Sequence, residues 1–175
     1  MSSTTSTDPP ARSRPTAGTG TPSPGAEIQP VSLDRPALFD AGVWTWARDR
    51  RFPELTEWFN AQVAHGLVLV CDLVVLELIR FTPNETRAQE VAERLDAFES
   101  VAMGEGLWKR ARELQSLLSS NGDHRRVPPV DLMIGAAAER ANVPLVHYDR
   151  DYERLARVSA LQHHWLVPDG ALAAE

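Results

Sequence analysis

Four acidic residues of this 175-residue chain lie in or at the edge of apolar segments: Asp40, Glu77, Asp131 and Asp149. Asp40 follows Ala-Leu-Phe, and Glu77 lies inside Leu-Val-Val-Leu-Glu-Leu-Ile. Asp131 precedes Leu-Met-Ile-Gly-Ala-Ala-Ala, and Asp149 follows Leu-Val-His-Tyr. Removing an ionised carboxylate from water is costly unless a cation or several hydrogen-bond donors compensate it. No lysine or arginine is equally placed, so the pattern predicts that a hydrated divalent metal ion supplies the missing positive charge.

Each acid also has a structural explanation that needs no metal. Asp131 stands after two prolines at the start of an expected helix, where an Asp is a common cap, and Asp40 could cap the helix that follows it. Glu77 could form an ion pair with Arg80, one helical turn further on. Asp149 could form an Asx turn with the acid two residues later. The four acids are therefore more informative as a set than singly.

The segments around these acids predict an α/β fold in which helices cover a mainly parallel sheet, as a three-layer α/β/α sandwich. Strands are expected at residues 37–40, 67–70 and 145–147, with shorter ones at 101–103 and 165–167. Helices are expected around Trp44 and Trp46 and at residues 55–65, 72–81 with Asp72 as its cap, 85–99, 107–118, 131–141 and 152–158. In parallel sheets, functional residues gather where strands meet the following helices, so all four acids can converge at one edge.

The bulk composition narrows the class of protein. Residues 1–34 are expected to be a disordered extension, because the segment up to about residue 30 is rich in Ser, Thr, Pro and Gly. Residues 35–172 are expected to form one domain. A net charge of −6 argues against a broad basic face for duplex nucleic acid, although a metal-loaded acidic site still attracts phosphate. The single cysteine, Cys71, excludes an intrachain disulfide. No membrane span or secretory signal is expected, and a cytoplasmic location is the simplest interpretation.

The ordered set of motifs resembles a PIN domain, in particular the toxin ribonucleases of the VapC type. The matching stretches are Leu-Phe-Asp40-Ala-Gly-Val-Trp, Leu-Val-Val-Leu-Glu77-Leu-Ile-Arg, Val-Pro-Pro-Val-Asp131-Leu-Met-Ile-Gly and Val-His-Tyr-Asp149-Arg-Asp151-Tyr. The resemblance implies a Mg²⁺-dependent or Mn²⁺-dependent endoribonuclease with RNA as substrate, a cognate antitoxin protein as partner and a homodimeric assembly. Oxygen ligands around an open site suit magnesium, whereas cysteine or histidine clusters would suggest zinc.

The resemblance also implies roles for the individual residues. Asp40 and Asp131 would be direct metal ligands, while Glu77 and Asp149 would complete the catalytic pocket through water or by orienting the attacking water. Asp151 would be auxiliary. One departure concerns Gly42, because many relatives carry a Ser or Thr two residues after the first Asp, and this chain lacks that hydroxyl.

Two other hypotheses remain open from the sequence: a PIN nuclease of RNA processing or DNA repair without an antitoxin, and a catalytically silent binding domain. The basic run of His124, Arg125 and Arg126 could contact an RNA backbone, although a solvated loop is the more frequent outcome. Of Trp44 and Trp46, at least one is expected in the core or an interface, because the two face different directions on a helix. His147, His163 and His164 lack metal-binding spacing and receive no chemical role.

Overall fold

The computed structural model describes residues 28–172, and these contain a five-stranded sheet in which each pairing is parallel. The strand order is β3-β2-β1-β4-β5. The strands are β1 (Ala37–Phe39), β2 (Val68–Val70), β3 (Glu99–Ser100), β4 (Leu145–His147) and β5 (His163–Trp165). The predicted α/β class with a parallel sheet is therefore confirmed.

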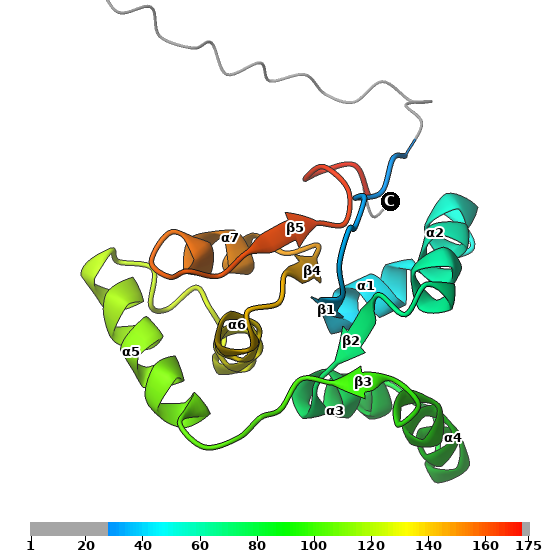
Figure 1. The fold of residues 1–175 in the computed structure, drawn as a ribbon, viewed down its shortest axis with the longest axis horizontal. Helices are drawn as coiled ribbons and strands as arrows, with labels where there is room; N and C mark the ends of the chain where they lie inside the picture. Colours follow the sequence, from blue (N-terminus) through cyan, green and yellow to red (C-terminus); the bar gives the residue numbers. More distant parts are fainter. Residues whose placement is uncertain (1–27, 173–175) are drawn as a thin grey trace, which may run out of the picture.

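Seven helices cover this sheet within the described residues: α1 (Ala41–Trp46), α2 (Pro53–Ala64), α3 (Asp72–Arg80), α4 (Glu85–Leu95), α5 (Leu107–Ser120), α6 (Pro129–Ala141) and α7 (Arg150–Ala156). Figure 1 shows α5, α6 and α7 on one side of the sheet and α1, α2 and α4 on the other. Right-handed crossovers require this split, because the chain moves outward from β1 to β3 and then returns past β1 to β4 and β5.

The core is built around the central strands, whose residues are all buried in β1, β2 and β4. Phe39 stacks on Trp58 at 5.5 Å between ring centroids, and Trp44 packs edge-on against Phe59 and Phe98. Trp44 is only 3% exposed, which confirms that one tryptophan of the Trp44 and Trp46 pair belongs to the core. This packing fixes the carboxyl end of β1, where Asp40 lies.

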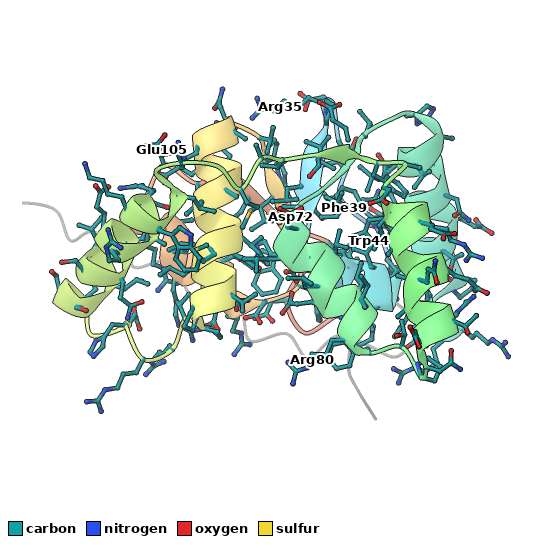
Figure 2. All side chains as sticks on the ribbon, turned by 90° about the horizontal axis from the view of Figure 1, so that it is seen from below. Arg35, Phe39, Trp44, Asp72, Arg80 and Glu105 are labelled. Atoms are coloured by element: carbon teal, nitrogen blue, oxygen red, sulfur yellow. The ribbon has the colours of Figure 1, made fainter. Side chains whose placement is uncertain are left out.

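Helices α3 and α6 bring two further acid-bearing segments together. Figure 2 shows α3 from end to end, with Asp72 at its start and Arg80 at its end, and α6 beside it. The sequence placed Asp72 as the cap of α3, and this is wrong in detail: Cys71 is the N-cap, with extended backbone angles, and Asp72 is the first helical residue. The helix starts one residue earlier than expected because β2 ends at Val70 and Cys71 alone links this strand to α3.

Two edge strands also lie elsewhere than expected. The strand predicted at residues 101–103 is found at Glu99–Ser100, where it pairs with Leu69 and Val70. The strand predicted at residues 165–167 is found at His163–Trp165, paired with β4. In both cases apolar residues that suggested a strand follow the observed one and fill the core, since Val101, Leu166 and Val167 are all buried; Trp165 itself lies in β5.

Part of the expected extension contacts the domain. Within residues 28–34, the amide of Val31 donates to the carbonyl oxygen of Leu166 at 2.9 Å, and Trp58 Nε1 donates to the carbonyl oxygen of Val31 at 2.7 Å. Ile28 and Leu33 pack against the core. Residues 1–27, to which the rest of the predicted extension belongs, lie outside the described residues.

None of the described helices combines the length and the apolar character that a bilayer crossing requires.

Candidate functional site

Asp40 lies directly after β1 and caps α1. Its Oδ2 accepts the amide hydrogen of Gly42 at 3.1 Å, so the predicted capping role is real. Its Oδ1 accepts the hydroxyl hydrogen of Tyr152 at 2.8 Å. Burial nevertheless raises the pKa of Asp40 above 3.8, and the charge of Asp149 adds to this rise. The hydrogen bonds to Asp40, which lower its pKa, therefore do not fully compensate the burial of the ionised carboxylate.

Glu77 lies in the middle of α3, half-buried. Burial and then the charge of Asp40 raise the pKa of Glu77, and the charge of Arg80 lowers it by less. The alternative of an ion pair does not hold, because no residue in the described chain pairs with Glu77 within 4.0 Å. The guanidinium of Arg80 lies instead over the ring of Phe81, 5.7 Å from its centroid.

Asp131 is the third residue of α6, which starts two residues earlier than predicted, at Pro129. Pro128 is the N-cap residue and no side chain caps this helix, so the capping explanation for Asp131 is not observed. Burial raises the pKa of Asp131 to about 7, and the charges of Asp40, Asp149, Glu77 and Asp151 add to the rise. The negative charges of all the other acids at this edge therefore act on Asp131.

Asp149 follows β4 and caps α7, since its Oδ1 accepts the amide hydrogen of Asp151 at 2.8 Å. The predicted Asx-type turn is therefore present. Asp151 forms an ion pair with Arg154, one turn further along α7. The carboxylate oxygens of Asp131, Asp149 and Asp151 lie within 4.8 Å of one another, a spacing that one cation can bridge.

The predicted site residues therefore gather at one edge of the sheet. Asp40 and Asp149 occupy the carboxyl ends of the neighbouring strands β1 and β4, while Glu77 and Asp131 come from the adjacent helices α3 and α6. Among the described residues, none of these four carboxylates has a lysine, arginine or histidine within 4.0 Å. Oxygen donors with an uncompensated negative charge fit a hard divalent cation such as Mg²⁺.

Asp151 and Tyr152 have a larger place in this geometry than the sequence suggested. Asp151 was expected to be auxiliary, but its oxygen lies in the three-residue group with Asp131 and Asp149. Tyr152 received no role, although it is 1% exposed and donates to Asp40. Burial raises the pKa of Tyr152 well above 10, so its hydroxyl remains a donor at neutral pH. A tyrosine one position after an acid carries no distinctive signal, and only the fold brings it to Asp40.

His147 is a second buried polar residue that the sequence left without a role. Its Nδ1 accepts the amide hydrogen of Asp149 at 3.1 Å, and its Nε2 lies 2.8 Å from Nδ1 of His163. With Nδ1 as acceptor, Nε2 carries the ring hydrogen and donates to His163. Burial lowers the pKa of His147 to about 3, so the ring is neutral and acts as a structural link.

The basic run before α6 lies close to the acidic edge. Arg126 is near enough to lower the pKa of Asp151 slightly, and it also pairs with Asp123 at 3.5 Å. Arg125 is exposed. Within this run, the effect on Asp151 therefore places Arg126 near the acidic edge.

Comparison with known proteins agrees with this fold. The family model described as "PIN domain" matches residues 37–158. The chain belongs to the PIN-domain family. The match runs from β1 into the residues after α7 and so includes all four predicted acids.

Curated relatives include two proteins of Mycobacterium tuberculosis. Ribonuclease VapC21 is 36% identical over 119 residues, which cover 67% of this chain and 86% of the relative. Ribonuclease VapC18 is 31% identical over 122 residues, which cover 69% of this chain and 89% of the relative. Both names describe ribonucleases, and both alignments span most of the relative's length.

Solved structures share the fold at low sequence identity. DNA-bound VapBC from Salmonella typhimurium aligns with a TM-score of 0.60 at 15% identity, covering 75% of this chain and 98% of the other. VapBC-1 from nontypeable Haemophilus influenzae aligns with a TM-score of 0.59 at 17% identity, covering 74% and 97%. The family fold is thus shared even where the sequences have diverged widely.

Proposed function

We propose that this PIN-domain protein is a divalent-metal-dependent endoribonuclease that hydrolyses RNA phosphodiester bonds and acts as the toxin of a toxin–antitoxin pair. The observation that carries the proposal is the gathering of Asp40, Glu77, Asp131 and Asp149 around one edge of the sheet, where no cationic side chain of residues 28–172 pairs with them. The ribonuclease names of the curated relatives support the reaction type.

The proposed role of each acid follows from its position in the site. Asp40 and Asp131 are proposed as direct ligands of Mg²⁺ or Mn²⁺, with Asp149 beside Asp131 in the group whose oxygens lie within 4.8 Å. Glu77 has no ion-pair partner among the described residues, so its carboxylate is free to hold and orient a water molecule. A bound divalent ion would supply positive charge against the phosphate and make an attacking water more acidic.

The substrate has to approach along the acidic edge, and the chain has arginine side chains beside this edge. Arg125 and Arg126 lie in the loop before α6, and Arg126 is close enough to influence Asp151. Such arginines position a phosphate backbone without reading sequence. The proposed substrate is single-stranded or looped RNA. The proposed place of its cleavage is the cytoplasm.

An antitoxin is the proposed partner, because solved neighbours of this fold are VapBC complexes. An arginine or lysine of such a protein, inserted among the acids, would satisfy the same missing positive charge and exclude the metal. The homodimer expected from the resemblance remains part of this proposal.

The test is cleavage of total RNA and transfer RNA by purified protein with Mg²⁺ or Mn²⁺ and, separately, with excess chelator. Wild type should cut only with metal. Asp40→Asn and Asp131→Asn should each lower the rate by at least about 100-fold, because each removes a ligand charge, and loss of a group that merely orients a ligand already costs roughly 10–100-fold. Asp72→Asn is the matched control, since Asp72 is an exposed acid in the first turn of α3. Undiminished cleavage in chelator, or equal rates for all variants, would refute the proposal.

A further inference from the structure

The hydroxyl of Tyr152 contacts the acidic edge from inside the core. Its ring is 1% exposed and lies at a tilt against His147, with 5.0 Å between ring centroids. The hydroxyl donates to Oδ1 of Asp40 at 2.8 Å, across 112 positions of sequence. A buried tyrosine needs a partner for its hydroxyl, and here that partner is one of the acids of the site.

The two oxygens of Asp40 are held from opposite parts of the chain. Oδ1 receives the hydroxyl hydrogen of Tyr152 on α7, and Oδ2 receives the amide hydrogen of Gly42 on α1. A carboxylate oxygen can accept more than one partner, so an oxygen that already accepts a hydrogen bond can still bind a cation. The plane of the carboxylate is therefore fixed before any cation arrives.

The tyrosine itself is anchored by the same segment that carries Asp149. Nδ1 of His147 accepts the amide hydrogen of Asp149, and the ring of His147 packs on Tyr152. His147 is in turn held by its contact with His163 on β5. Asp40 and Asp149 are thus connected through one buried group of rings, which holds the carboxyl ends of β1 and β4 in a set relation.

We propose that Tyr152 is a positioning residue that holds the Asp40 carboxylate in the orientation needed to bind a divalent cation; the proposal rests on the function proposed above. Without this donor, repulsion from the neighbouring acid Asp149 would turn Asp40 away from the others in the metal-free protein. Gly42 leaves room for this orientation, since a Cβ at that position would lie 3.1 Å from Oδ2 of Asp40, and its amide holds that oxygen. Backbone and tyrosine together leave the carboxylate little freedom.

The alternative is that Tyr152 only fills the core and that its hydroxyl bonds to the nearest acceptor. Tyr152→Phe separates the two explanations, because it keeps the ring and its packing on His147 and removes the hydroxyl alone. Tyr148→Phe is the matched control. Tyr148 also bonds through its hydroxyl, but its partner is the amide of Leu172 at 2.8 Å.

The measurement is Mn²⁺ binding by isothermal titration calorimetry on the full-length wild type, Tyr152→Phe and Tyr148→Phe. We expect the Mn²⁺ dissociation constant of Tyr152→Phe to rise about tenfold, the usual effect of losing a group that orients a metal ligand, and that of Tyr148→Phe to stay within about twofold of wild type. Circular dichroism checks that both variants are folded. A dissociation constant for Tyr152→Phe equal to that of Tyr148→Phe overturns the proposal.

Asp40→Asn and the double variant Asp40→Asn, Tyr152→Phe complete the experiment. If Tyr152 acts through Asp40, the second substitution should leave the Mn²⁺ affinity of Asp40→Asn unchanged, whereas an additional tenfold loss in that background would overturn the proposal. Mn²⁺ binding unaffected by Asp40→Asn would show that Asp40 is not a ligand and so refute the metal site proposed above. Weakened binding in Asp40→Asn with unchanged binding in Tyr152→Phe refutes only the role of Tyr152.

Discussion

Replacing Asp131 by asparagine should stabilise the metal-free protein at neutral and alkaline pH, although it removes a proposed ligand. Burial and four neighbouring acids raise the pKa of Asp131 from 3.8 to about 7. A carboxyl group whose pKa is higher in the folded chain binds its proton more tightly there than in the unfolded chain. The free energy of unfolding therefore falls as the pH rises from about 4 to about 7, and stays low above that range.

The size of the effect follows from the same pKa difference. A difference of about 3 corresponds to about 4 kcal/mol, which is an upper limit for this half-exposed and strongly coupled group. Water near the carboxylate and proton uptake by neighbouring acids reduce it, so a gain of about 1–2 kcal/mol at pH 8 is expected for Asp131→Asn. At pH 4, where the wild-type group is protonated, the two proteins should be nearly equal in stability.

The assay is urea unfolding of both proteins in excess chelator at pH 4, 5, 6, 7 and 8. Asp72→Asn is the control, because it also removes an acid from the first turn of a helix, but an exposed one. Loss of a favourable interaction with the helix N-terminus should destabilise that control by about 0.3–1 kcal/mol. Parallel pH curves for wild type and Asp131→Asn, or a loss of stability at pH 8, would refute the reasoning. Saturating Mg²⁺ should reverse the order of stability, since only wild type retains the full ligand charge.

Two further predictions concern the framework that positions α6. A Cβ on Gly135 would lie 2.2 Å from Cδ2 of the fully buried Leu155. Gly135→Ala should therefore push α7 away from α6 and lower the free energy of unfolding, measured in urea, by about 1–3 kcal/mol. Unchanged stability would mean that the Leu155 side chain can move aside at no cost. Glu139 accepts two hydrogen bonds from Arg110, at 2.7 and 2.8 Å, and one from the amide of Ala160, at 2.8 Å. Glu139→Ala should therefore lower the free energy of unfolding by about 1–3 kcal/mol, and Arg110→Ala in that background should add little, because both substitutions break the same pair.

The central strands could be predicted from sequence because each is a run of apolar residues between polar boundaries. Ala37–Phe39, Val68–Val70 and Leu145–His147 are buried along their whole length, as central parallel strands are expected to be. The edge strand Glu99–Ser100 could not be found this way, since both its residues are exposed and its only structural signal is its pairing with β2. Hydrophobicity locates buried strands, whereas edges are set by tertiary pairing.

The site shows the same division. Asp40 and Asp149 could be located because acids at the carboxyl ends of strands stand out against the apolar residues before them. The sequence also raised capping for Asp131, but the structure places the start of α6 at Pro129 and leaves Asp131 inside the first turn. The bond between Tyr152 and Asp40 had no local signature, since the residues that form it are 112 positions apart.

The placement of the acids explains how the fold holds them close together without a cation. Asp40 and Asp149 cap α1 and α7, and Asp131 lies in the first turn of α6, so three of the four acids are near helix N-termini, where free amide groups favour negative charge. This compensation is incomplete, because the pKa values of Asp40 and Asp131 are still raised. The amides hold the carboxylates in place, and the remaining deficit of positive charge is what a divalent cation, or a basic side chain of an inhibitor, would satisfy. A site with full compensation would have little affinity for either.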